Sequence, residues 1–200
     1  MPRSHQLIYG IYIIIWTIMA IHPKYPEDWL LENILVFLFF PFLIWMDLKY
    51  SFSVVALSMF LVFASLHSLG SHFTYAKMEY FDVITNWMGF ERNHFDRVVH
   101  FLFGLLLFRI FFEIVMSYAK TFRSAIFFTS TLILSISMLY EIIEWLAEII
   151  FHPELGIAFL GTQGDVWDAQ KDNIAAFLGT LLNLIFYRTY KDIYHKKLDR

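Results

Sequence analysis

Histidine and carboxylate side chains recur at helical spacings in three separate parts of this 200-residue chain. Within each part, two such residues stand three or four positions apart and so share one face of a helix. The six residues are Asp96, His100, Glu141, Glu144, Asp168 and Asp172. Imidazole and carboxylate groups bind divalent metal ions, perform acid–base catalysis, or relay protons and ions. The pattern therefore predicts one polar site and leaves these three chemistries open.

Side-chain type suggests a role for each candidate. His100 is the best general base or metal ligand, and the carboxylates suit acid–base roles or metal binding. The candidates for catalysis are His100, Glu141, Glu144 and Asp168, and all six residues are candidate ligands of a divalent metal ion. A surrounding shell is expected from His67, His72, Trp145, Trp167 and Gln170. No H-E-x-x-H, Glu-x-x-His or G-x-S-x-G motif narrows the reaction.

Other polar residues have a structural explanation. His67 and His72 are five positions apart, so they cannot both point inward from one regular helix. Arg109 and Glu113 are four apart and are expected to pair with each other. Asp165 and Glu148 are more simply interpreted as solvated helix ends, and His94 as a surface residue. The small residues Ala175, Ala176 and Gly179 are expected to allow close helix packing.

The composition is that of a membrane protein. Apolar residues make up 58% of the chain and charged residues 16%, with a mean hydropathy of +0.57. Soluble domains are nearer half apolar and a quarter charged. A net charge of −3 excludes a strongly basic nucleic-acid-binding surface, and the lack of cysteine excludes disulfides and thiolate chemistry. No linker or internal repeat divides the chain, so residues 1–200 are expected to form one integral membrane domain.

Six apolar runs are long enough, or nearly so, for transmembrane helices of about 20 residues. The runs are Leu7–Ile21, Trp29–Met46, Ser51–Leu69, Phe95–Ala119, Ser124–Tyr140 and Asn173–Tyr187. Apolar residues within Ser71–His94 fall on one helical face, which is typical of an amphipathic helix lying on the membrane. Phe151–Gln170 reads as a lid or a partly re-entrant loop. The predicted fold is an all-α polytopic bundle of about six transmembrane helices plus an outer interfacial helix.

Lysine and arginine predict the orientation. With six spans, nine of these residues lie on the side that holds both termini and five lie on the other side. Because positive charge favours the cytoplasmic side, both termini are expected in the cytoplasm. The histidine and carboxylate residues then gather at the outer face.

Three stretches carry a resemblance to known proteins. They are Phe95–Leu106 (FDRVVHFLFGLL), Tyr140–Trp145 (YEIIEW) and Leu160–Asp172 (LGTQGDVWDAQKD). Together they resemble the YjdF family of bacterial inner-membrane proteins, a family of unknown function. That resemblance implies a multi-pass protein of the bacterial inner membrane and supplies no substrate.

A looser similarity is to VanZ-like membrane proteins, which are linked to glycopeptide resistance at the cell envelope. It rests on His100-Phe101, on Glu141, and on Asp168 or Asp172 with Asn173, Ala176 and Gly179.

These observations favour a membrane enzyme, assisted by a divalent metal ion, that acts on a lipid or a lipid-linked envelope substrate. Two other classes stay open. An ion-coupled transporter would place its carboxylates near mid-membrane in broken helices. A non-catalytic scaffold would use the same residues to lock its helices together. The sequence leaves the substrate, the metal and the oligomeric state undetermined, and membrane lipids are the expected surroundings.

Overall fold

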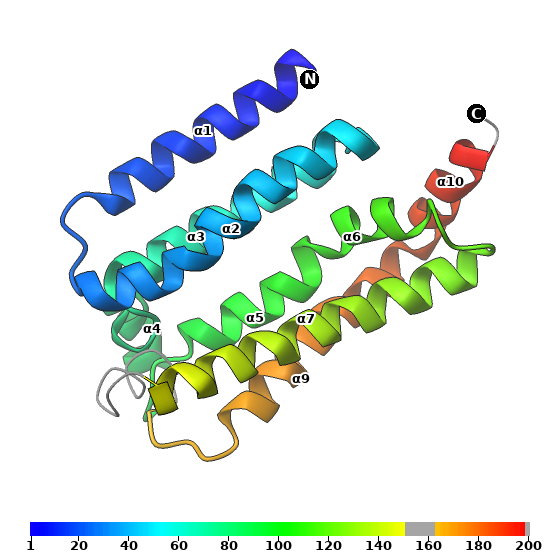
Figure 1. The fold of residues 1–200 in the computed structure, drawn as a ribbon. Coiled ribbons are helices and arrows are strands. Elements are labelled where there is room, and N and C mark those ends of the chain that lie inside the picture. Colours follow the sequence, from blue (N-terminus) through cyan, green and yellow to red (C-terminus); the bar gives the residue numbers. More distant parts are fainter. Residues whose placement is uncertain (151–162, 199–200) are drawn as a thin grey trace.

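The computed structural model describes residues 1–150 and 163–198, and every regular element within them is helical. The α-helices are α1 (Arg3–Ala20), α2 (Pro26–Tyr50), α3 (Val54–Phe73), α4 (Glu79–Met88), α5 (Phe95–Leu106), α6 (Phe108–Val115), α7 (Phe122–Ile150), α9 (Asp168–Leu182) and α10 (Tyr187–Leu198). Two 3₁₀ turns, η1 (Tyr75–Lys77) and η2 (Asn183–Phe186), join neighbouring helices. The long helices run along one common direction, as a bundle (Figure 1). The predicted all-α class is confirmed.

Four of the described helices are long and apolar enough to cross a membrane. They are Pro26–Tyr50, Val54–Phe73, Phe95–Val115 (which joins α5 and α6) and Phe122–Ala147. The first and last predicted spans are not among them. Helix α9 has 15 residues, or about 22 Å at 1.5 Å per residue, against a hydrocarbon core of about 30 Å. Helix α1 begins with the polar residues Arg3, Ser4, His5 and Gln6.

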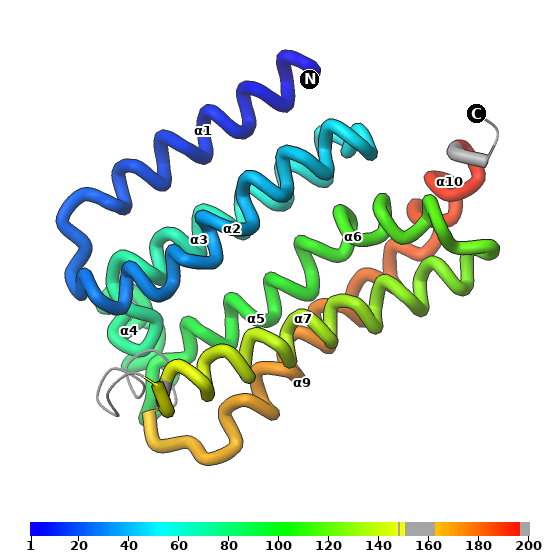
Figure 2. Tube along the Cα trace, in the orientation of Figure 1, coloured from blue at the N-terminus to red at the C-terminus, as the bar shows by residue number. Residues whose placement is uncertain are grey.

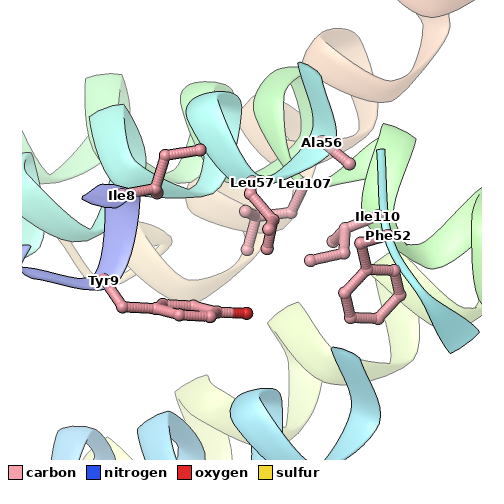
Figure 3. Packing of buried hydrophobic residues seen from close by; sticks show 7 residues of the cluster. All are labelled: Ile8, Tyr9, Phe52, Ala56, Leu57, Leu107 and Ile110. Atoms are coloured by element: carbon pink, nitrogen blue, oxygen red, sulfur yellow. The ribbon is translucent and has the colours of Figure 1, made fainter. Parts of the chain in front are cut away.

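Large apolar side chains cover the outside of the bundle. On α2, for example, Phe37, Leu38 and Trp45 are exposed. In water such a surface would drive aggregation, whereas in a bilayer it faces lipid tails. The buried apolar residues form separate clusters, and Figure 3 shows the one between α1, α3 and the α5–α6 segment: Ile8, Tyr9, Phe52, Ala56, Leu57, Leu107 and Ile110.

The amphipathic segment between α3 and α5 forms a shorter helix than predicted. Helix α4 ends where Gly89 adopts a left-handed conformation, with φ of +68°. Tyr80, Val83 and Trp87 are exposed, while Met78 packs in a buried cluster with Phe95. The helix thus presents an aromatic and aliphatic surface away from the bundle, as an interfacial helix would.

Helices α5 and α9 lie directly against each other (Figure 2). Gly104 on α5 faces the backbone of Ala176 and Thr180, and Gly179 on α9 faces the backbone of Phe101 and Leu105. A Cβ atom at either glycine would collide with a carbonyl oxygen of the other helix. Small residues therefore let the two backbones meet, as the sequence predicted for Ala176 and Gly179.

Polar contacts within and between helices stabilise the end of the bundle opposite to the predicted site. His5 Nδ1 lies 2.8 Å from Asp47 Oδ2, which joins α1 to α2. Arg109 Nε donates to Glu113 Oε1 at 2.5 Å, which confirms the predicted pair. Glu113 also accepts a hydrogen bond of 2.8 Å from the backbone N–H of Ser53 at the start of α3.

Candidate functional site

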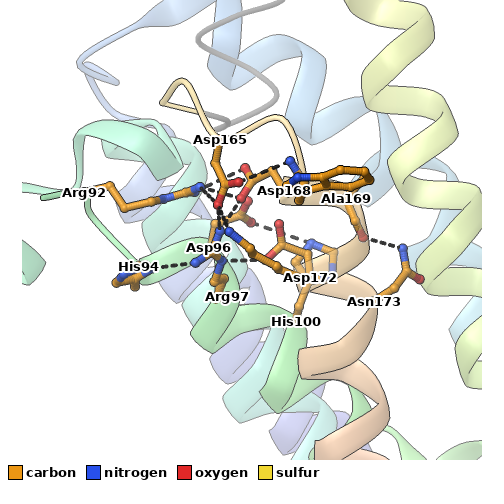
Figure 4. Close-up of polar contacts among 12 residues, drawn as sticks. Arg92, His94, Asp96, Arg97, His100, Asp165, Asp168, Ala169, Asp172 and Asn173 are labelled. Carbon is orange, nitrogen blue, oxygen red and sulfur yellow. Dashed lines mark hydrogen bonds and ion pairs between the residues drawn. The ribbon is translucent and has the colours of Figure 1, made fainter. Parts of the chain in front are cut away.

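The six predicted site residues are all buried at one end of the bundle. They come from the first two turns of α5 and α9 and from the second half of α7. Figure 4 shows four of them, Asp96, His100, Asp168 and Asp172, pointing into the space between α5 and α9. The close α5–α9 packing brings the starts of these two helices together.

Two arginines hold the start of α9. Arg92 donates to both carboxylate oxygens of Asp168, at 2.5 and 3.1 Å. Arg97 donates to Asp168 at 2.8 Å and to Asp165 at 2.6 Å. Lys171 adds a third cation at 2.6 Å from Asp165. This ion-pair network connects the segment before α5 and the first turn of α5 to the start of α9.

Three aspartates form a compact group of oxygen atoms. Asp96, Asp168 and Asp172 each offer one carboxylate oxygen, and these oxygens all lie within 4.8 Å of one another. All three residues are at least nine-tenths buried. Asp172 Oδ1 accepts no hydrogen bond from the described residues, and its nearest cationic atom is Arg97 Nε at 3.6 Å. The group has the ligand type that hard divalent cations prefer.

His100 connects the aspartates to α7. Its Nε2 atom lies 3.7 Å from Asp96 Oδ1 and 3.4 Å from Glu141 Oε1. Its Nδ1 atom is 3.5 Å from the hydroxyl of Ser137. Glu141 Oε1 is buried and makes no hydrogen bond within the described part of the chain. These separations are longer than good hydrogen bonds, so the imidazole and Glu141 keep unused capacity to bind.

Negative charge exceeds positive charge among the buried groups at this end. Seven carboxyl groups are buried here, against the guanidinium groups of Arg92 and Arg97 in the described residues. The seven are Asp28, Glu32, Asp96, Glu141, Glu144, Asp168 and Asp172. Unpaired charge is costly to bury, so bound protons or a bound cation must neutralise part of it.

Sequence reasoning missed three members of this cluster. Glu32 of α2 is buried and accepts a hydrogen bond of 3.0 Å from the Tyr140 hydroxyl. The Tyr140 ring in turn lies 5.9 Å, centroid to centroid, from the His100 ring. Arg92 and Arg97 were among the five positive residues counted on the side away from the termini, and Arg97 was interpreted as part of a solvated helix end. Glu32 could have been identified from the sequence, since it is an acid at the start of an otherwise apolar run. A carboxylate within a membrane helix usually faces a polar partner.

The predicted surrounding shell is only partly present. His67 Nδ1 and the Tyr75 hydroxyl are 2.6 Å apart near the cluster, whereas His72 Nδ1 is 2.8 Å from the backbone oxygen of Met19. The two histidines thus point apart, as their spacing required.

Three shell predictions need correction. Trp145 and Trp167 are 55% and 62% exposed, and Gln170 is exposed. Neighbouring residues of a helix point about 100° apart, so burial of Glu144 turns Trp145 outward. Trp167 contacts the site through its backbone N–H, which donates to Asp165 at 3.1 Å.

Asp165 and His94 were expected to be solvated, and the structure gives both of them partners. Asp165 pairs with Arg97 and Lys171, and these two hydrogen bonds hold the pKa of its carboxyl well below the usual range. His94 Nδ1 is 3.2 Å from Arg97 Nη1, and its pKa is lowered by partial burial and by the charge of Arg97. The Glu148 side chain lies outside the described residues.

Most of Phe151–Gln170, the predicted lid or partly re-entrant loop, lies outside the described part of the chain, since residues 151–162 are not described. Immediately after them, the Gln163 side chain accepts from the backbone N–H of Asn93 at 2.9 Å. It also donates to the Asn93 backbone oxygen at 2.8 Å. This double hydrogen bond anchors the start of the segment that leads into α9.

The low pKa of Asp165 predicts a pH dependence. Because its pKa is lower in the folded than in the unfolded state, Asp165 stabilises the fold fully above an unfolded pKa of about 3.9. That contribution is lost as the pH falls towards the folded pKa. We expect the melting temperature of the wild type to exceed that of Asp165→Asn at pH 6 to 7, and the gap to narrow below about pH 4. A constant gap over this pH range would contradict the assignment.

Apolar spans, a lipid-facing exterior and a buried charged cluster at one end define a multi-pass α-helical membrane protein. Residues 4–193 match the family model described as "Predicted membrane protein (DUF2238)", and the chain belongs to that family. It is 32% identical over 176 residues to the inner membrane protein YjdF of Escherichia coli K12, an alignment that covers 87% of this chain and 83% of the relative. No solved structure matches the chain.

Proposed function

We propose that this protein is a membrane enzyme that binds a divalent cation between Asp96, Asp168 and Asp172 and acts on a lipid or lipid-linked substrate. The observation that carries the proposal is the group of three buried carboxylates, whose oxygens lie within 4.8 Å of one another. The unpartnered oxygens of Asp172 and Glu141 support it, because each is a buried acceptor without a donor among the described residues. A cation between the three aspartates would satisfy the Asp172 oxygen and offset part of the excess negative charge.

The donor set favours a hard cation such as Mg²⁺ or Mn²⁺, since its core is three carboxylates. The cation would polarise an ester or phosphoryl oxygen of the substrate or activate a water molecule. His100 would act as general base, oriented by Glu141 and Ser137, which lie 3.4 and 3.5 Å from its two ring nitrogens. Glu144, one helical turn from Glu141, would serve as a further ligand or acid.

The topology proposed with this function has six crossings. Helix α1 and the continuous α9, η2 and α10 segment would complete the four apolar helices, with α4 lying at the membrane surface. The excess of lysine and arginine on the side of the termini favours the cytoplasm for both ends. The cluster would then open at the outer face of a bacterial inner membrane, the membrane named for the Escherichia coli relative.

Metal binding by the detergent-purified protein tests the proposal. We expect the wild type to bind one Mn²⁺ per chain, measured by electron paramagnetic resonance titration, and Asp172→Asn to weaken binding by more than about tenfold, since it removes a ligand. The matched control is Asp192→Asn on α10, where the aspartate is exposed. No saturable binding by the wild type, or equal binding by the two variants, would overturn it.

A structural scaffold is the second candidate, and the ion-pair network favours it. Arg92 and Arg97 already satisfy Asp168, and such pairs lock helices without any reaction. Under this alternative, protons rather than a metal neutralise the remaining carboxyl groups. The Mn²⁺ titration separates the two, because a scaffold shows no stoichiometric binding. The transporter alternative gains no support from Asp96, Asp168 and Asp172, since these three acids lie at the starts of α5 and α9.

A further inference from the structure

A long apolar cavity of about 320 Å³ adjoins the carboxylate cluster. Its walls come from α1, α2, α3, α5, α6 and α7, and Phe52, Leu107 and Ile110 in Figure 3 form part of them. The volume is within the range of about 300–1,000 Å³ typical of small-molecule sites. The part of the cavity lined by apolar side chains does not hold ordered water, because water needs polar partners.

The polar groups of the cavity gather at one end. The residues that line that end are His67, Tyr75, Asp96, His100, Ser137 and Tyr140, and the other lining residues are apolar apart from the hydroxyl of Tyr12. Two of these six residues, Asp96 and His100, also belong to the cluster of buried carboxylates and histidine. The cavity is therefore amphiphilic along its length, with its polar end at the candidate metal site.

Helix α2 forms a wall that is attached at its two ends. Near the polar end, Glu32 accepts the hydrogen bond from Tyr140 of α7. At the opposite end, the Tyr50 hydroxyl contacts that of Tyr118, which follows α6. Between these attachments, Phe39 and Phe42 line the cavity and are nevertheless 58% and 50% exposed. The α2 side of the cavity is thus covered by protein only incompletely and faces the lipid-contacting exterior.

We propose that this cavity holds a single hydrocarbon chain of a membrane amphiphile, which enters from the bilayer past the middle of α2. Its polar head would lie at His100 and Asp96. The apolar lining matches a hydrocarbon chain, and the polar end matches a head group. A hydrocarbon chain gains little free energy by moving from the lipid into an apolar cavity. The contacts of the polar head group at His100 and Asp96 would therefore decide which amphiphile binds. The inference rests on the proposed function and specifies its substrate as an amphiphile held by one chain.

Photolabelling tests this with a neutral probe, hexadecanol carrying a diazirine near the end of its chain. The full-length protein in lipid nanodiscs is irradiated with the probe in the presence of EDTA, and labelled residues are identified by mass spectrometry. We expect labelling of the wild type at Phe103 and Leu107, which line the cavity, with excess hexadecanol as competitor abolishing it. Labelling confined to outward-facing side chains would overturn the proposal.

Two cavity-filling variants with matched controls sharpen the result. Ala64→Phe on α3 and Ile136→Trp on α7 add volume inside the cavity. Val62→Phe and Leu139→Trp introduce the same aromatic side chains at exposed positions of the same helices. We expect the filling variants to reduce labelling of Phe103 about tenfold or more, and the controls to leave it unchanged.

Each outcome decides the question. If Ala64→Phe does not fold, Ile136→Trp supplies the comparison, since its wild-type side chain is already large and only partly buried. Undiminished labelling in a folded filling variant contradicts the proposal. Because EDTA removes divalent cations, the photolabelling measures binding of the hydrocarbon chain without any metal. Its failure can therefore be distinguished from a failure of Mn²⁺ binding.

Discussion

Gly104→Ala is expected to destabilise the protein by about 3 kcal/mol or more, the upper end of overpacking effects. The added methyl group would meet the carbonyl oxygen of Ala176 and the backbone nitrogen of Thr180. These atoms belong to the helix backbone, so they cannot move aside as the tip of a flexible side chain can. Relief would require α5 and α9 to separate along their length, which would also draw Asp96 away from Asp172.

The measurement is reversible unfolding in mixed detergent micelles, and Gly10→Ala is the control. Gly10 lies inside α1 with no heavy atom within 4 Å of an added Cβ. Alanine there should be neutral or stabilise by up to about 1 kcal/mol, through the better helix propensity of alanine. Equal unfolding of Gly104→Ala and Gly10→Ala would show that the two helices are not packed backbone to backbone.

Arg97→Gln is expected to reduce the free energy of unfolding by about 3 kcal/mol, the lower end of the range for breaking a buried ion pair. The lower end applies because the Arg97 side chain is 20% exposed. Its loss removes the hydrogen bonds to Asp165 and Asp168 and the nearest cation of Asp172. Three carboxylates at the start of α9 would then depend on Arg92 and Lys171.

Arg188→Gln, at an exposed position of α10, is the matched control and should change stability by less than about 0.5 kcal/mol. The double variant Arg97→Gln with Asp165→Asn should recover part of the loss, because the second substitution removes an orphaned charge. An Arg97→Gln protein as stable as the control would mean that the network adds nothing to the fold.

Much of the fold was predictable from periodicity and composition. Apolar runs placed the long helices, and the i, i+4 spacings of Asp96 with His100 and Asp168 with Asp172 correctly put each pair on one inward face. Those signals are local, since 3.6 residues per turn alone decide which side chains share a face. The same geometry explains why the Trp145 prediction failed: adjacent residues of a helix point about 100° apart, so Trp145 does not share the inward face of Glu144.

Partners from other helices were beyond such reasoning. Glu32 binds Tyr140 across 108 positions of sequence, and Arg92 binds Asp168 across 76. The sequence showed that these groups are charged or polar in an apolar chain, and hence that each needs a partner if buried. It did not show which partner, because that depends on how α2, α5, α7 and α9 pack.

Side-chain chemistry and local spacing thus established a helical membrane protein with histidine and carboxylates at its helix ends. Packing established the rest. The absence of side chains at Gly104 and Gly179 lets α5 and α9 meet, and this contact sets Asp96 beside Asp168 and Asp172. The apolar cavity beside them is also a product of packing, since its walls come from six helices and no single segment encodes it. Distances between helices depend on the fit of whole surfaces, which a linear pattern of residue types does not contain.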